Sequence, residues 1–180
     1  MYEIPKILEL NEKVLWEGRP RYAAWMAGPI VLIVLLLFVG FIFGPVAMIL
    51  IVIISIAELV YFHLAYIVTH YALTNKRAIF QFGIIGRDFR SVDYDQVQNA
   101  SVDVNLVGLI FNVGTVGLFT GELESYKNTI GPRYDSFTYI ENPYATLKLL
   151  QQHLSLRKET MYGGFEKTPI DKKLDEIFKK

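Results

Sequence analysis

Side chains that could do catalytic or metal chemistry are few and scattered in this chain. It has no Cys, which removes thiolate nucleophiles, thiolate metal sites and disulfides together. Its histidines, His63, His70 and His153, form no His-x-x-His or His-Glu-x-x-His pattern, and no carboxylates stand beside them at ligand spacing. We interpret all three as interfacial or surface residues. We therefore expect no enzyme activity, no metal site and no cofactor.

Four cations close to one predicted β-turn are the candidates for binding a lipid or a protein partner: Lys76, Arg77, Arg87 and Arg90. Cations at a membrane surface attract anionic headgroups by about 1 kcal/mol each. However, three aspartates lie among these residues, and the sequence has no dense basic run. Surface salt bridges that fix the strand register are the competing interpretation.

The elements that must position these residues begin with a long apolar run. Between about Tyr22 and His70, Glu58 is the single charged side chain. A membrane-spanning helix needs about 20 mostly apolar residues, so this run is about twice one crossing. Gly44-Pro45 lies near its middle, and Pro suits the first turn of a second helix. The run therefore predicts a membrane hairpin over residues 22–68, with helices at about 23–39 and 45–68.

Two other interpretations of this run are weaker. A signal peptide would have one shorter apolar stretch followed by a small-residue cleavage site. A buried hairpin would need a larger polar shell than a chain of 180 residues provides. We expect an integral, multi-pass protein of the cytoplasmic membrane.

Basic residues on both sides of the hairpin predict its orientation. Lys6, Lys13, Arg19 and Arg21 precede it, Lys76 and Arg77 follow it, and the connecting turn has neither Lys nor Arg. By the positive-inside rule both termini face the cytoplasm. Tyr and Trp residues near the proposed inner ends, such as Trp25 and Tyr66, suit the interface.

Glu58 and Ser55 are the polar side chains that interrupt the second helix. Ionisable residues inside a membrane helix are functional candidates by default, and polar side chains pair such helices. Glu58 lies about 15 Å along the axis from Val68, at 1.5 Å per residue. It is therefore either at the inner interface or in the membrane, where it would pair with His63 or a second subunit. We expect a homo-oligomer or a complex with another membrane protein.

After the hairpin, short alternating apolar stretches and turn residues replace the continuous run. They predict a mainly-β cytoplasmic domain over residues 69–156, between an N-terminal arm (1–21) and a polar tail (157–180). The expected strands are 66–73, 77–82, 84–90, 97–104, 113–120 and 136–140, and residues 121–133 are expected to form a loop. In the tail, Ile170, Leu174 and Phe178 could line a short amphipathic helix.

Asn142-Pro143 predicts the start of a helix that runs to about Leu156. Its leucines at 147, 150 and 154 form one apolar stripe that can pack on the sheet. Strands followed by one closing helix predict a small antiparallel barrel or sandwich capped by a C-terminal helix. This is the architecture of a pleckstrin-homology-like (PH-like) domain.

The chain up to about Leu156 also resembles the membrane-flanked bacterial PH proteins, the YdbS-like group, which has archaeal members. The resemblance rests on the order and spacing of six segments: Val14 to Pro20, Tyr71 to Arg77, Phe82 to Arg87, Val97 to Val102, Val113 to Val116 and Phe119 to Gly121. Members often carry a basic residue before the last glycine-containing strand, where this chain has Leu109-Ile110-Phe111. The resemblance implies the fold and the membrane anchor, and it implies no general biochemical activity.

The leading functional expectation is a membrane-anchored binding or scaffold module that recruits proteins and associates with itself. The alternatives are a module that senses lipid headgroups or organises the membrane, and an accessory subunit of a membrane complex. The 18 basic and 18 acidic residues balance, so the composition does not indicate a nucleic-acid partner.

Overall fold

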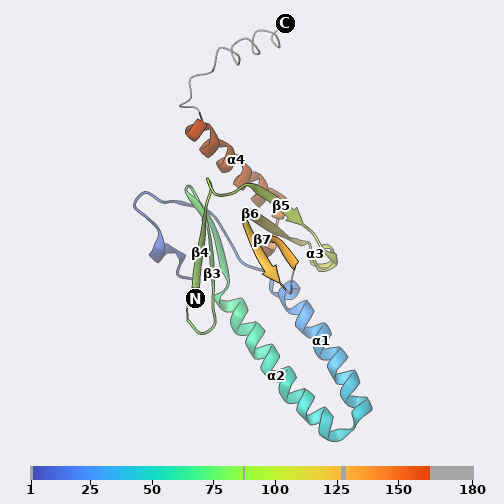
Figure 1. The fold of residues 1–180 in the computed structure, drawn as a ribbon. Helices are drawn as coiled ribbons and strands as arrows, with labels where there is room; N and C mark the ends of the chain where they lie inside the picture. Colours follow the sequence, from blue (N-terminus) through green and yellow to red (C-terminus); the bar gives the residue numbers. More distant parts are fainter. Residues whose placement is uncertain (1, 87, 127–128, 163–180) are drawn as a thin grey trace.

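The computed structural model describes residues 2–86, 88–126 and 129–162, which form a helical hairpin and a β-rich domain (Figure 1). The hairpin projects from one end of the domain. Arg87 and the amphipathic helix expected in the tail lie outside the described residues.

The hairpin consists of α1 (Tyr22–Phe43) and α2 (Pro45–Val68). Gly44 joins the two helices with a φ of 94°, and Pro45 occupies the first turn of α2. Helix α1 continues past Val39, where the sequence predicted its end. Gly40 does not stop the helix because its bare Cα packs against α2, where an added Cβ would lie 2.8 Å from the Ile51 side chain.

Both helices are long and apolar enough to cross a membrane. Within their most apolar windows, 17% of the residues of α1 and 6% of those of α2 are buried. The core helix of a soluble protein would be mostly covered by the rest of the fold. In this hairpin the apolar side chains point outward instead, as lipid-facing side chains do.

The β-rich domain contains two antiparallel sheets. The four-stranded sheet has the order β1-β2-β3-β4, with β1 (Val14–Gly18), β2 (His70–Thr74), β3 (Arg77–Phe82) and β4 (Asp88–Asp93). The three-stranded sheet has the order β5-β6-β7, with β5 (Asn99–Asp103), β6 (Val113–Tyr126) and β7 (Thr129–Glu141). Helix α4 (Pro143–Tyr162) follows the last strand, as the sequence predicted.

The strands do not close into a barrel within the described residues, so of the two predicted forms the fold is the sandwich. The reason lies in the turn between β4 and β5. Tyr94 and Val97 are buried there, and the Tyr94 hydroxyl donates to the Thr74 carbonyl at 2.6 Å. The chain therefore crosses the core from one sheet to the other instead of continuing the ladder.

Aromatic rings join the two sheets. Phe137 of β7 stacks on Phe80 at 4.6 Å between ring centroids, and it packs on Tyr71 and Trp16 at 5.3 and 5.5 Å. Helix α4 closes the same core with Leu150, which is fully buried.

The N-terminal arm is part of this domain, which the prediction of a separate arm over residues 1–21 missed. Strand β1 pairs with β2, so that Trp16 lies opposite Leu73. Before it, the 3-10 helix η1 (Ile4–Ile7) covers the outer face of the four-stranded sheet, where Ile4 packs with Ala72 and Ile79. The domain is therefore assembled from chain segments on both sides of the hairpin.

Four further local expectations differ from the structure. The strand expected over 66–73 begins only at His70, because α2 continues to Val68. The strand expected at 84–90 begins only at Asp88, because Gly83 and Gly86 adopt positive φ and form a turn. A short helix, α3 (Leu106–Phe111), precedes β6 and was not expected. The loop expected over 121–133 is an extended β6–β7 ladder that ends with Tyr126 opposite Thr129.

Candidate functional site

The domain has an end near the hairpin and an end far from it. Strand β2 starts directly after α2, and β3 returns antiparallel, so that His70 lies opposite Gln81. The β3–β4 loop is therefore at the hairpin end, and the β2–β3 turn is about 17 Å away, at 3.3 Å per residue. Lys76 and Arg77 lie at that far turn, although the sequence suggested that they would lie close to a membrane surface.

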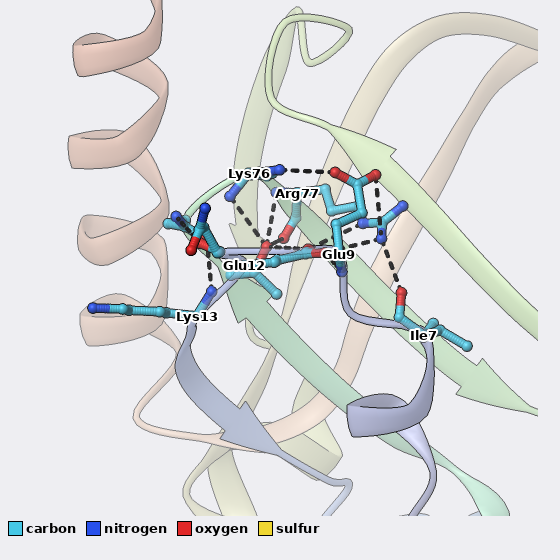
Figure 2. Close-up of polar contacts among 9 residues, drawn as sticks. Ile7, Glu9, Glu12, Lys13, Lys76 and Arg77 are labelled. Carbon is cyan, nitrogen blue, oxygen red and sulfur yellow. Dashed lines mark hydrogen bonds and ion pairs between the residues drawn. The ribbon is translucent and has the colours of Figure 1, made fainter.

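Lys76 and Arg77 are held by the N-terminal arm (Figure 2). Arg77 donates to both carboxylate oxygens of Glu12, each at 3.0 Å, and Thr74 donates to the same carboxylate at 2.8 Å. Lys76 forms an ion pair with Glu9 at 2.8 Å. The Glu12 side chain is fully buried. We call these five residues the arm clamp. The clamp neutralises both cations.

Arg90 is also paired within the domain. It contacts Asp135 at 2.7 Å and Glu122 at 2.9 Å, and it thereby links β4 of one sheet to β7 and β6 of the other. Burial raises the pKa of the Asp135 carboxyl, and the adjacent guanidinium opposes that rise. The interpretation that these cations form salt bridges thus fits the described residues, and Arg87 lies outside them.

Ser55 and Glu58 lie in the middle of α2. Ser55 is 5% exposed, and its hydroxyl has no hydrogen-bond partner among the described residues. Half-buried Glu58 follows one turn later, on the helix face that also carries Phe62, whose carbonyl accepts from Trp25 of α1 at 3.1 Å. Because the hairpin covers Ser55, a second copy could reach Glu58 more easily. Self-association through these residues stays a prediction.

The three histidines lie apart. His63 packs edge-on against Tyr22, and His153 stacks on Tyr94. His70 contacts the ring of Tyr2, and burial lowers the pKa of its imidazole. Among the described residues no three His, Asp or Glu side chains gather as a metal site would require.

A cavity of about 690 Å³ lies where the hairpin meets the domain. Its walls come from the β1–α1 connection, the end of α2 and the start of α4. Residues from all three elements line it: Trp16, Glu17, Arg19, Arg21, Tyr22, Tyr66, Glu141, Asn142, Thr146 and Leu149. We call this cavity the junction cleft.

The two arginines of the junction cleft differ in how they are held. Arg21 is fixed to the domain, because its backbone N–H donates to Tyr139 and its guanidinium donates to the Phe111 carbonyl at 2.9 Å. The guanidinium also lies 3.9 Å from Glu141. Arg19 is exposed and lies 5.5 Å from the centre of the Tyr66 ring. Within the described residues no carboxylate pairs with Arg19.

The junction cleft thus brings together a guanidinium without a carboxylate partner among the described residues, an aromatic wall and polar groups. A guanidinium matches phosphate geometry with two parallel hydrogen bonds, and it stacks on aromatic rings. Sequence reasoning used Arg19, Arg21 and Tyr66 for the membrane orientation, the family resemblance and an expected strand, and it did not name them as site residues. The signal for the cleft is the segment Trp16 to Tyr22, which places two arginines and two aromatic residues around the start of α1.

Comparison with known proteins places the domain in a family. Residues 30–151 match the family model described as Bacterial PH domain. The chain belongs to this family. A comparison with curated proteins gives no match. The crystal structure of a DUF1696 family protein with a pleckstrin-homology domain, from Shewanella loihica, is similar at a TM-score of 0.42 and 11% identity, over 83% of this chain and 88% of that one.

The bacterial PH domain match begins inside α1 and ends in α4. It therefore leaves out β1, the arm clamp's glutamates and both arginines of the junction cleft. These parts are supplied by the first 21 residues of this chain, which fold onto the matched region.

Proposed function

We propose that this chain is an integral membrane protein of the YdbS-like kind, anchored by the α1–α2 hairpin. At 1.5 Å per residue, the 22 and 24 residues of its helices span about 33 and 36 Å, enough for a hydrocarbon core of about 30 Å. Basic residues at the domain end and none at the Gly44 turn support a cytoplasmic domain with both termini on that side.

On this membrane we propose that the PH-like domain binds the phosphate of a phospholipid headgroup in the junction cleft. The observation that carries the proposal is Arg19, an exposed guanidinium that no described carboxylate pairs, held over Tyr66 at the inner end of α2. Tyr22 begins α1 and packs on Tyr66 at 4.8 Å, so the cleft opens at the depth where headgroups lie.

The charges of the junction cleft favour a phosphodiester with one negative charge. Its two arginines face two glutamates, Glu17 and Glu141. Arg21 is already close to Glu141, and Glu17 accepts a hydrogen bond from Tyr2. Because the hydrogen bond from Tyr2 leaves Glu17 charged, the four side chains sum to zero, and such a cleft suits one phosphodiester on Arg19 better than a headgroup with several phosphates.

The fluorescence of Trp16, which lines the cleft, tests this proposal. In a Trp25→Phe background Trp16 is the sole tryptophan. The full chain in mild detergent is titrated with short-chain phosphatidylglycerol, with inorganic phosphate and with short-chain diacylglycerol. We expect a saturable change with phosphatidylglycerol only. Arg19→Gln should weaken it about 10-fold or more, since a hydrogen bond to a charged group contributes about 1.5–3 kcal/mol.

Lys13→Gln is the matched control, because Lys13 is exposed and lies in the arm near the far turn, where its backbone N–H contacts Asn75. Equal responses to phosphatidylglycerol and inorganic phosphate would indicate a site for free phosphate. Equal affinity in Arg19→Gln would contradict the assignment of the cleft. If Trp16 fluorescence responds to none of the three compounds, a protein partner is favoured instead.

A further inference from the structure

Two segments at the hairpin end of the domain carry strongly exposed apolar side chains. One is the β3–β4 loop, where Ile85 is 99% exposed. The other is α3, whose Leu106, Leu109 and Ile110 are 72%, 69% and 68% exposed. Single exposed apolar residues are ordinary on protein surfaces, whereas groups of them mark contact surfaces.

The position of the β3–β4 loop follows from the sheet. Gln81, near the end of β3, donates to the carbonyl of Val68, the last residue of α2. Gly83 and Gly86 have φ values of 101° and 108° and turn the chain tightly within a few residues. The turn therefore holds Ile85 beside the inner end of α2, with no covering contact from the domain.

Helix α3 lies beside the inner end of the other membrane helix. The guanidinium of Arg21, the residue before α1, donates to the Phe111 carbonyl at the end of α3. Gly108 turns inward, where an added Cβ would lie 2.6 Å from the Val113 carbonyl. Leu109 and Ile110 follow Leu106 by three and four residues, so all three lie on the outward face of α3.

Figure 1 shows the two segments on either side of the hairpin, level with the ends of its helices. The α2 side carries the β3–β4 loop, and the α1 side carries α3. Apolar side chains at the level of the helix ends have the same surroundings as those ends. In a membrane, that region is the boundary between the headgroups and the acyl chains.

We propose that Ile85 and the outward face of α3 insert into the bilayer interface and act as two lateral anchors of the domain. This inference rests on the proposed membrane insertion of the hairpin. With anchors on both sides, the domain cannot tilt freely about the hairpin, so the junction cleft stays open toward the headgroups.

Single-cysteine labelling tests the anchors, because the chain has no native Cys. Full-length Ile85→Cys and Leu109→Cys carry an environment-sensitive fluorophore in nanodiscs that contain lipids spin-labelled near the headgroup. We expect strong quenching and a blue-shifted emission at both positions. Leu10→Cys is the matched control: Leu10 is 91% exposed but next to the arm clamp, and we expect little quenching there.

A label at Ile53→Cys, in the middle of α2, is measured with lipids spin-labelled deep on the acyl chain, and it separates this inference from the proposed function. Quenching at Ile53 without quenching at Ile85 and Leu109 overturns the anchors and leaves the hairpin in place. Quenching at Ile85 and Leu109 without quenching at Ile53 would overturn the spanning hairpin and, with it, the role of these two segments as lateral anchors beside it. Absence of quenching at all three positions overturns both proposals.

Discussion

Leu150→Asp is expected to unfold the β-rich domain of the full-length protein. Leu150 is fully buried between α4 and the two sheets. The substitution removes its apolar contacts, at about 2–5 kcal/mol, and adds an unpaired carboxylate to an apolar core. The sum is comparable to the whole stability of a small domain. In mild detergent, the cooperative unfolding transition of Trp16 fluorescence should disappear.

Lys148→Asp is the matched control for that substitution. Lys148 is exposed two residues earlier on α4, so its replacement should shift the transition only slightly. The measurement needs the full chain, because a fragment that starts at residue 69 lacks β1 and the arm. Equal tolerance of the two substitutions would mean that α4 does not pack on the sheets through its leucine stripe.

Glu12→Gln is expected to destabilise the same domain by about 3 kcal/mol. The buried carboxylate accepts from Arg77 with both oxygens and from Thr74 with one. Its removal leaves the Arg77 guanidinium, 17% exposed, without its main partner. Breaking a buried pair by removing one partner typically costs about 3–5 kcal/mol. Denaturant unfolding of the full chain, followed through Trp16, measures the loss.

The pH dependence of the unfolding free energy is a second test of the arm clamp. Burial raises the pKa of Glu12, but hydrogen bonds from Arg77, the Glu9 backbone and Thr74 outweigh burial and hold the pKa below its ordinary 4.5. The stabilisation by Glu12 is therefore complete above about pH 4.5 and is lost as the pH falls through the lowered value. Glu12→Gln should flatten this acid limb.

Glu9→Gln is the control for the clamp. Glu9 is more than half exposed, and its ion pair with Lys76 lies in solvent, so little change in stability is expected. If Glu12→Gln and Glu9→Gln behave alike, the arm does not depend on the buried pair.

The hairpin and α4 could be predicted from the sequence because their signals are local. A long run without charge, a Gly-Pro turn and a leucine stripe each lie within one element. Strand β1 lacks such a signal. Its five residues include Trp16 and Glu17, and its partner Leu73 comes 57 positions after Trp16, beyond the whole hairpin. The pairing depends on chain topology, which periodicity does not report.

The extension of β6 and β7 was missed for a different reason. Apolar alternation reveals a strand only where one of its faces is buried. In this ladder Leu123 lies opposite Pro132 and is 65% exposed, so burial does not mark the strand at that position. Backbone pairing alone extends the hairpin there, and polar residues make those hydrogen bonds as well as apolar ones.

The candidate site could also not be predicted from local sequence patterns. The sequence pointed to cations near a turn, and the fold pairs the described ones with carboxylates far away in the sequence, such as Glu12 for Arg77. Charge patterns do not reveal which cations are neutralised in the folded chain. Arg19 became a candidate only when α2 placed the Tyr66 ring under its guanidinium.

Labelling the two ends of the molecule from opposite sides of a cell membrane tests the anchored-domain account most directly. Phe43→Cys is at the hairpin turn, 75% exposed, and Leu10→Cys is at the far end of the domain. In intact spheroplasts, a membrane-impermeant maleimide should label Phe43→Cys at once and Leu10→Cys only after permeabilisation. Labelling of both positions from the same side would contradict a hairpin that crosses the membrane and holds the domain in the cytoplasm.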